Sequence, residues 1–398
     1  CMILKSYAVF YDKGENMAEW KKVKLGEIFS ERIEKNSENL MLLAITGAYG
    51  IVPRSELDLK DNSSEDKSKY LKIYVGDIGY NTMRMWQGVS AYSDYEGIVS
   101  PAYTVLKPKS SIDSKYFSYL FKMPEMIFKF YRYSQGLVDD TRNLKYQNFR
   151  NIYVFFPADK KEQQKIAEIL STQDKLIELK QKLIDNKKQQ KKWLMQNLLT
   201  AKIRLKGFSG EWKKVKLGEI FSERTERNSE NLMLLAVTGT RGIIPRSELD
   251  LKDNSSEDKS KYLKICVGDI GYNTMRMWQG VSAYSNYKGI VSPAYTVLKP
   301  AAWINSKYFS YLFKMPEIIF NFYRFSQGLV DDTRNLKYNN FSKIKVFYPV
   351  KKNEQNAIAE ILSTQDKEIE LLEKELKQEK LRKKALMQLL LTGKIRVV

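Results

Sequence analysis

The sequence predicts an α+β fold: two copies of a mixed α/β domain that leans towards β, and two long helices that pair between them as an antiparallel coiled coil. Three observations support this prediction. Residues 20–204 align with residues 212–396 at a constant offset of 192 and without a gap, so one unit occurs twice. Each unit begins with short β-rich runs broken by Gly, Pro, Asn and Asp. A long segment without Gly or Pro then follows, which is typical of a helix.

The composition changes near Pro157 and Pro349, which divides each unit into a globular domain and a helix. A chain of 398 residues is also too long for one core, since single cores stop growing at roughly 250 to 300 residues. The start of the chain lies outside the repeat, and Cys1 stands where an initiator Met is expected, so we interpret the first sixteen residues as a cloning remnant or a misread start. The predicted segments are an extension at 1–16, domains at 17–158 and 205–350, and long helices at 159–204 and 351–398.

Inside each domain we expect short strands and one pair of short helices. Runs such as YLKIYVGDIGYN, GVSAYS and AYTVLKP are rich in β-branched and aromatic residues, which predicts strands joined by turns. The apolar spacing of Lys115–Tyr133 predicts two short helices that meet at Pro124, because proline interrupts a helix.

Both long helices carry apolar residues at heptad-related positions, which predicts a seam for a partner helix. The seam residues are Ile166, Leu170, Ile177, Ile184, Leu194 and Leu198 in the first helix, and Ile358, Leu362, Ile369, Leu372, Leu376, Leu386 and Leu390 in the second. We expect the two helices to pair with each other; the alternative is that each packs only on its own domain. An antiparallel pair would form a rod of about 60 Å, with a pseudo-two-fold axis relating the domains at its ends.

The chain is strongly basic, with a formal net charge of +20. This charge predicts a polyanionic partner, with double-stranded DNA as the first candidate and an acidic membrane surface as the second. The sequence has no apolar run long enough to span a bilayer and no lipidation signal, so we expect no membrane partner and a cytoplasmic location. Residues 160–204 hold 12 Lys or Arg against 5 Asp or Glu, and residues 351–396 hold 11 against 8. These basic faces are compatible with DNA contact and with docking of a protein.

The composition excludes many catalytic sites. Histidine is absent, which removes imidazole catalysis and most zinc or iron sites. The two cysteines, Cys1 and Cys266, predict no structural disulfide, because the repeat partner of Cys266 is Tyr74. The sequence contains no Walker-type phosphate loop, no dinucleotide fingerprint and no Asn-Pro-Pro-aromatic methylation motif. We therefore expect no cofactor, no metal and no catalytic residue.

Two acidic patterns could still suggest cleavage chemistry. The first is an acidic-x-Lys pattern formed by Glu56, Asp58 and Lys60, and repeated at Glu248, Asp250 and Lys252. The second is the adjacent carboxylate pair Asp139 and Asp140. So short an acidic-x-Lys pattern is usually a solvated turn, and a carboxylate pair without a third ligand is a weak metal site. We expect the aspartates to orient a neighbouring arginine.

Four motifs occur in the same order in both halves: W-x-x-V-x-L-G-E-I, G-D-I-x-x-N, S-P-A-Y-x-V and E-Q-x-x-I-A-x-I-L-x-x-x-D. They stand at Trp20–Ile28, Gly76–Asn81, Ser100–Val105 and Glu162–Asp174, and again at Trp212–Ile220, Gly268–Asn273, Ser292–Val297 and Glu354–Asp366. In this order and duplication, over almost the whole chain, the sequence resembles Type I restriction-modification specificity (S) subunits, with two nearly identical target-recognition domains.

The resemblance implies a subunit that has no catalytic activity and reads DNA for its partners. Two adenine-N6 methyltransferase subunits would bind its helices, around Gln163 and Gln355, and restriction subunits that translocate DNA would join that core. S-adenosylmethionine and ATP would belong to those partners. The two domains of a typical member differ, whereas these nearly match. We therefore expect a split target with nearly inverted half-sites. The helices would hold the two domains at a fixed spacing over these half-sites.

Base reading calls for Arg, Lys, Asn or Gln side chains on a rigid frame, and three sets of residues fit. The preferred set lies in one loop of each half and consists of Asn81, Arg84 and Gln87, and Asn273, Arg276 and Gln279. The alternative interpretation of this segment is a surface loop whose Met and Trp side chains cap the core. The second set comes from SQGLVDDTRNLKY: Gln135, Arg142, Asn143 and Lys145, and Gln327, Arg334, Asn335 and Lys337. The third set makes the second half more basic: Arg241 and Lys288, where the first half has Tyr49 and Glu96.

Two other functions compete with this interpretation. A stand-alone DNA-binding protein, such as a repressor on an inverted operator, would need duplicated readers but no methyltransferase. A nuclease or methyltransferase in one chain is disfavoured by the missing motifs. Tight DNA binding without a partner would favour the repressor, and DNA cleavage or methylation by the pure chain would favour the enzyme.

Overall fold

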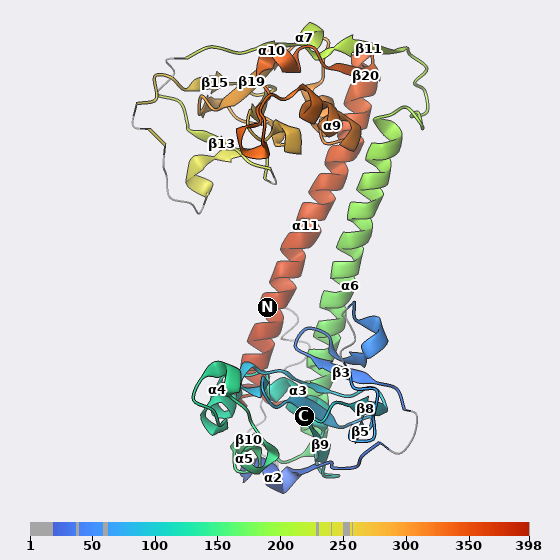
Figure 1. The fold of residues 1–398 in the computed structure, drawn as a ribbon, viewed down its shortest axis with the longest axis vertical. Coiled ribbons are helices and arrows are strands. Elements are labelled where there is room, and N and C mark those ends of the chain that lie inside the picture. The colour runs from blue at the N-terminus through green and yellow to red at the C-terminus, as the bar shows by residue number, and fades with distance from the viewer. Residues whose placement is uncertain are drawn as a thin grey trace. The chain divides into compact units, whose positions relative to one another are not determined.

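The computed structural model describes residues 19–36, 40–58, 63–227, 231–239, 241–249, 255–256 and 258–397. The predicted extension at 1–16 lies outside these residues. The chain divides into two compact units: unit 1 comprises Cys1–Gln181 and Glu375–Val398, and unit 2 comprises Lys182–Lys374. Each unit contains one globular domain and one end of each long helix (Figure 1).

The domain of unit 1 consists of short strands and short helices, as the sequence predicts. Its strands are β1 (Trp20–Lys24), β2 (Phe29–Glu31), β3 (Leu43–Thr46), β4 (Gly50–Pro53), β5 (Leu71–Ile73), β6 (Ile78–Asn81), β7 (Ser90–Tyr92), β8 (Gly97–Val99), β9 (Tyr103–Pro108) and β10 (Tyr153–Pro157). Its helices are α2 (Leu25–Ile28), α3 (Ser114–Leu120), α4 (Pro124–Tyr133) and α5 (Tyr146–Phe149). The predicted helical pair is confirmed: Pro124 is the first residue of α4, where its missing N–H is not needed.

A four-stranded antiparallel sheet in the order β2-β9-β6-β7 lies at the centre of this domain, and β1–β10, β3–β4 and β5–β8 form separate antiparallel pairs. Strand β6 is buried as far as Tyr80, because it pairs with a neighbour on each side. It ends at Asn81, opposite Tyr103 of β9. The loop that follows therefore starts from a fixed point in the middle of the sheet.

The core of unit 1 is an aromatic cluster that also takes in the helix ends. Phe117 of α3 contacts Phe29 and Phe156, with ring centroids 5.2 and 4.9 Å away. Residues far along the chain join the same core: Ile166, Ala167 and Leu170 from the first long helix, and Leu390, Leu391 and Val397 from the C-terminal segment. The globular domain and both helix ends are therefore one packed body.

Unit 2 repeats this architecture, and its central sheet has the order β12-β19-β16-β17. Its strands are β11 (Trp212–Lys216), β12 (Phe221–Glu223), β13 (Leu235–Val237), β14 (Ile243–Pro245), β15 (Leu263–Ile265), β16 (Ile270–Asn273), β17 (Ser282–Tyr284), β18 (Gly289–Val291), β19 (Tyr295–Pro300) and β20 (Lys345–Pro349). Its short helices are α7 (Leu217–Ile220), α8 (Ser306–Leu312), α9 (Pro316–Phe325) and α10 (Tyr338–Phe341). Leu198, Leu199, Ile358 and Leu362 bring the long helices into its core.

The two predicted long helices are α6 (Lys160–Leu198) and α11 (Lys352–Leu390), each of 39 residues. Polar contacts join them within each unit, and the residue number falls along α11 as it rises along α6. The contacts are Gln173–Glu379 at 2.9 Å and Lys180–Glu375 at 2.6 Å in unit 1, and Lys187–Glu368 at 2.6 Å and Lys191–Asp366 at 2.5 Å in unit 2. The antiparallel pairing is thus confirmed. No helix among the described residues combines the length and the apolar character that crossing a membrane requires.

The predicted apolar seam is buried over most of its length. Away from the helix ends, Ile184, Ile369 and Leu376 keep only 1, 8 and 7% of their surface exposed. Towards the ends, Ile166 and Leu362 are wholly buried because they pack on the domains. The helices therefore pair with each other along their middle and pack on the globular domains near their ends, so both interpretations of the seam apply.

Candidate nucleic-acid interface

The preferred reading loop, residues 81–88, is rigid and presents two polar side chains to solvent. The Asn81 side chain accepts a hydrogen bond from the Met83 N–H at 2.9 Å, which turns the chain as it leaves β6. A short 3-10 helix, Met85–Gln87, follows, and buried Met85 anchors it to the core. Gly88 closes the loop at φ +80°, in the left-handed region that favours glycine. Arg84 and Gln87 remain exposed on this frame.

The copy of this loop, residues 273–280, has the same construction. Asn273 accepts from the Met275 N–H at 3.0 Å, Gly280 has φ +80°, and Arg276 and Gln279 are exposed. No hydrogen bond or ion pair within the described residues engages the guanidinium of Arg84 or Arg276. Free guanidinium donors on a fixed loop are suited to bidentate recognition of a base edge or a phosphate.

The second predicted segment, residues 134–145, forms a narrow loop whose two sides are joined. Gln135 and Asn143 exchange backbone hydrogen bonds of 2.8 and 2.7 Å, and the Asn143 side-chain amide donates to the Thr141 carbonyl at 3.1 Å. Gly136, at φ +124°, leaves no room for a Cβ atom, which would lie 2.6 Å from the Thr141 oxygen. The side chains of Gln135 and Lys145 are exposed, and so is Leu137 at the tip.

Arg142 fixes this segment rather than extending into solvent. Its guanidinium lies 4.0 Å from the ring centroid of Tyr131 and 5.9 Å from that of Trp86. It also forms an ion pair of 3.4 Å with Asp139, and only 13% of its side chain is exposed. The expectation that an aspartate orients the arginine is therefore confirmed for Asp139. Arg334 repeats the arrangement over Tyr323 and Trp278, with Asp331 as its carboxylate.

The structure brings the two predicted segments together on one surface. The Leu144 N–H donates to the Thr82 carbonyl at 2.8 Å, and Leu336 donates to Thr274 at the same distance. The Trp86 ring N–H donates to the Met83 carbonyl at 2.9 Å within its own loop. Of the residues predicted to contact DNA, we name those exposed on this surface the reading face. They are Arg84, Gln87, Gln135 and Lys145 in unit 1, and Arg276, Gln279, Gln327 and Lys337 in unit 2.

The residues that make the second half more basic occupy other loops. Arg241 is bound within its own domain, because its guanidinium contacts the Glu248 carbonyl at 3.0 Å and the Glu248 carboxylate at 3.3 Å. Lys288 is exposed between β17 and β18, where the first half carries exposed Glu96. Of the acidic-x-Lys pattern, Lys60, Asp250 and Lys252 lie outside the described residues. The described residues contain no group of three or more Asp, Glu or Cys residues that could hold a metal ion.

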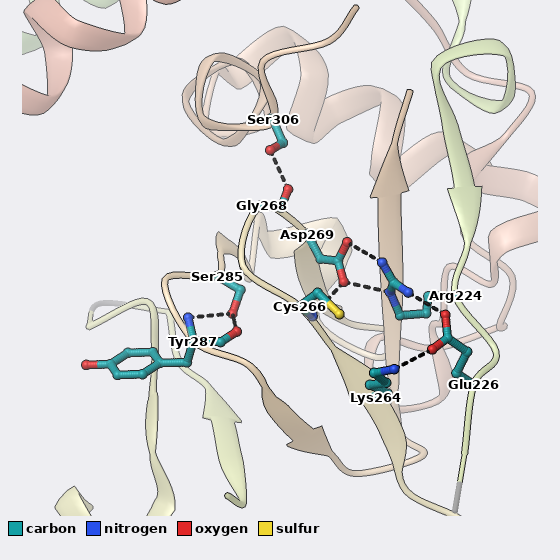
Figure 2. A network of polar contacts seen from close by, with 9 residues as sticks. All are labelled: Arg224, Glu226, Lys264, Cys266, Gly268, Asp269, Ser285, Tyr287 and Ser306. Atoms are coloured by element: carbon teal, nitrogen blue, oxygen red, sulfur yellow. Dashed lines mark hydrogen bonds and ion pairs between the residues drawn. The ribbon is translucent and has the colours of Figure 1, made fainter. Parts of the chain in front are cut away.

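A buried ion pair positions the central strand of each domain. In unit 2, Arg224 bonds both carboxylate oxygens of Asp269 at 2.7 and 3.1 Å, directly before β16 (Figure 2). Asp269 also accepts from the backbone N–H of Cys266, and the exposed Glu226 carboxylate bonds Arg224 (Figure 2). Arg32 and Asp77 repeat the pair before β6. This pair could not be predicted from the sequence, because no local pattern links residues 45 positions apart.

The glutamines predicted to contact a partner serve each domain instead. Gln163 is wholly buried; its side-chain oxygen accepts from the Asp113 N–H at 2.8 Å, and its amide donates to the Pro157 carbonyl at 3.0 Å. Gln355 makes the same two contacts, with Asn305 and Pro349. They fasten the start of each long helix to its own domain. Any partner surface at these helix starts has to come from exposed neighbours.

We expect Gln163→Leu to lower the free energy of unfolding of unit 1 by about 2 kcal/mol, because it leaves the buried Pro157 carbonyl and the half-buried Asp113 N–H without partners. Urea unfolding followed by circular dichroism measures the change. Gln164→Leu is the matched control, since Gln164 is the exposed neighbour on the same helix turn. Equal shifts for the two variants would contradict the fastening role of Gln163.

Comparisons with known proteins agree with the resemblance seen in the sequence. The chain matches the family described as "Type I restriction modification DNA specificity domain" twice, over residues 17–187 and 209–380. It is 27% identical over 412 residues to the Type I restriction enzyme MjaVIII specificity subunit of Methanocaldococcus jannaschii, and the alignment covers 95% of this chain and 93% of that protein.

Two solved structures share the fold. One is the Type I restriction-modification S subunit from M. genitalium, with 15% identity, a TM-score of 0.59 and coverage of 95% of this chain and 97% of that one. The other comes from work on complex assembly and conformational transition of the type I R-M system, with 13% identity, a TM-score of 0.53 and coverage of 95% and 99%. Since the family match spans most of the sequence in two copies, this chain belongs to the Type I restriction modification DNA specificity family.

Proposed function

We propose that this chain reads DNA for a Type I restriction-modification complex and carries out no catalytic step itself. The observation that supports this most strongly is the presence, in both copies of the family domain, of an exposed Arg and Gln on a rigid loop fixed to the central sheet. Family membership favours this function over a stand-alone DNA-binding protein. The partners' methylation and cleavage would take place in the cytoplasm, beside the DNA.

In this proposal the residues of the reading face divide into two roles. Arg84 and Arg276 would read a guanine edge, and Gln87 and Gln279 an adenine edge, because these side chains match those base patterns bidentately. Gln135, Lys145, Gln327 and Lys337 would contact phosphates and set the register. The remaining candidates, Asn81, Arg142 and Asn143 with their copies Asn273, Arg334 and Asn335, would hold the loops in shape.

The two domains would read nearly inverted half-sites of one split target. Their loops have the same sequence and the same geometry, so each would prefer the same bases. The difference between them would be one of strength. Lys288, where the first domain has Glu96, would make binding by the second domain tighter and more dependent on salt; Arg241 would add to this only if it releases Glu248.

The partners would be two methyltransferase subunits, joined by restriction subunits. Exposed apolar side chains on the long helices support a protein partner there: Leu176 and Leu179 in unit 1, and Leu183 and Leu371 in unit 2, are 37 to 58% exposed. Apolar residues in such number on charged helices are suited to a docking surface. Any bound methyl donor or nucleotide would belong to these partner subunits.

The experiment that tests this function is methylome sequencing of cells that express the chain with and without the methyltransferase encoded beside it. We expect a split, near-palindromic motif methylated on adenine, present only when both proteins are made. A catalytically inactive methyltransferase expressed with the chain is the control. Soluble, active partners that add no new motif would refute the proposal and favour a stand-alone DNA-binding protein.

A further inference from the structure

A lysine outside the reading face holds the end of each reading loop. Lys122, between α3 and α4, is half-buried, and its ammonium donates to the Gly88 carbonyl at 2.7 Å. In unit 2, Lys314 donates to the Gly280 carbonyl at 2.6 Å. These glycines close the reading loops. A Cβ atom placed on Gly88 would lie only 3.0 Å from Cδ1 of Ile127 in α4. The loop end is therefore confined by one apolar contact and one charge-assisted hydrogen bond.

The environment of this lysine is unfavourable to its charge. Burial and, to a smaller extent, the nearby Lys383 cation lower the pKa of Lys122 to about 8. The pKa of Lys314 is lowered to about 8 in the same way, by burial and then by Lys191. The Gly88 carbonyl is the hydrogen-bond acceptor that keeps the Lys122 ammonium in place. A neutral amine would make a weaker bond to the same oxygen.

The second cation comes from a long helix and belongs to a network that fastens α3. In unit 1, Asp174 of α6 accepts from the Tyr119 hydroxyl at 2.8 Å and from Lys383 of α11 at 2.5 Å. In unit 2, Asp366 accepts from Tyr311 at 2.7 Å and from Lys191 at 2.5 Å. Of these groups, Lys383 on α11 is the one whose charge acts on Lys122. Burial and Asp174 raise the pKa of Tyr119 far above its usual range, so this hydroxyl stays neutral.

We infer that Lys122 and Lys314 are positioning residues that hold the reading loops in their DNA-binding conformation. This inference rests on the proposed function, because it assumes that residues 81–88 and 273–280 meet DNA. The lysines themselves touch no base. They fix the Gly88 and Gly280 carbonyls, and thereby the direction in which Arg84 and Arg276 leave the loop.

The test uses the full chain with its methyltransferase and measures affinity for the methylated target duplex by fluorescence anisotropy from pH 7 to 9.5 at constant salt. We expect the affinity of the wild type to fall on the order of tenfold as the two ammonium groups lose their protons. The double variant Lys122→Met and Lys314→Met should bind weakly at every pH and lose this dependence. The double variant Lys122→Arg and Lys314→Arg should bind as tightly as the wild type at pH 7 but without the pH dependence, because arginine keeps its charge up to pH 9.5.

Two further variants separate the lysine's role from general damage. Lys383→Met with Lys191→Met should move the midpoint of the pH profile upward, because removing a neighbouring cation raises the pKa of Lys122 and Lys314. Lys129→Asn is the matched control: Lys129 also donates to a backbone carbonyl, that of Tyr153 at 2.9 Å, and its counterpart in unit 2 is Asn321. Its profile should equal that of the wild type.

The stability of the fold should change with pH in the opposite direction. The folded-state pKa of these lysines, about 8, lies below their ordinary 10.5. Between these two values the unfolded chain binds more protons, so their contribution to stability rises with pH. Thermal unfolding over the same pH range therefore distinguishes weaker positioning from partial unfolding.

Failure of this inference can be told apart from failure of the proposed function. A wild-type chain that directs methylation but binds its target equally from pH 7 to 9.5, or a methionine variant that keeps the pH dependence, would overturn the positioning role alone. If the chain directs no methylation, amide hydrogen exchange at Gln87 and Gly88 still tests whether Lys122 positions the loop. Faster exchange in Lys122→Met than in Lys129→Asn supports the positioning role, and equal exchange overturns it.

Discussion

Replacing Arg84 and Arg276 with alanine in one chain should reduce the preference for the target over unrelated DNA on the order of a hundredfold, since each bidentate base contact contributes about 1–3 kcal/mol of discrimination. Each single variant should impair one half-site, and to a similar degree, because the two loops are alike. Competition binding with duplexes mutated in one half-site measures both effects. If one arginine instead met only phosphate, its loss would weaken binding to all sequences and reduce the salt dependence.

The control for this prediction comes from a difference between the two halves. Arg150 is exposed, and its counterpart is Ser342. Arg150→Ser therefore removes the same charge as Arg84→Ala while copying a residue that the other domain already uses. We expect its target preference to match the wild type. An equal loss of target preference in Arg150→Ser and Arg84→Ala would show that Arg84 contributes only as part of a general basic surface.

Arg32→Ala should destabilise unit 1 by about 3–5 kcal/mol, because it leaves the carboxylate of Asp77 buried without its cation. The Arg32 and Asp77 side chains are only 9 and 3% exposed, and they bond at 2.7 and 3.1 Å. The Tyr74 N–H would remain as a donor to Asp77 but would not replace a charge. Chemical unfolding should show the loss as a lower midpoint for unit 1, and Arg224→Ala should do the same for unit 2.

Glu34→Gln is the matched control, because Glu34 bonds the same arginine from an exposed position, with 52% of its side chain in solvent. Exposed ion pairs contribute about 0–1 kcal/mol, so this variant should unfold almost like the wild type. Comparable midpoints for Arg32→Ala and Glu34→Gln would show that the buried pair does not anchor the start of β6.

The features predicted correctly from sequence are those encoded by neighbouring residues. The gap-free repeat gave two copies of one domain, the absence of Gly and Pro marked α6 and α11, and Pro124 marked the start of α4. Local chemistry also identified the two segments that meet on the reading face. Their contact, from Leu144 to Thr82, depends on how the sheet and α4 pack, and no local pattern expresses that.

Gln163 shows why burial at the helix starts was not predicted from the sequence. It lies three residues before Ile166 and seven before Leu170, on the face that both bury. The helical spacing thus contained a signal for burial, and its polar side chain obscured that signal. The Arg32–Asp77 and Lys122–Gly88 contacts had no such signal, since their partners are brought together only by the tertiary fold.

The way unit 1 closes also determines the order in which the chain can finish folding during synthesis. Leu390, Leu391 and Val397 belong to its core, and Arg396 pairs with buried Glu162. The ribosome makes these residues only after the whole of Lys182–Lys374, the continuous stretch that forms unit 2. Domains usually complete in order from the N-terminus, but here the later domain can close first. Until then the core of unit 1 lacks Leu390, Leu391 and Val397, so apolar surface of the earlier domain stays exposed to solvent.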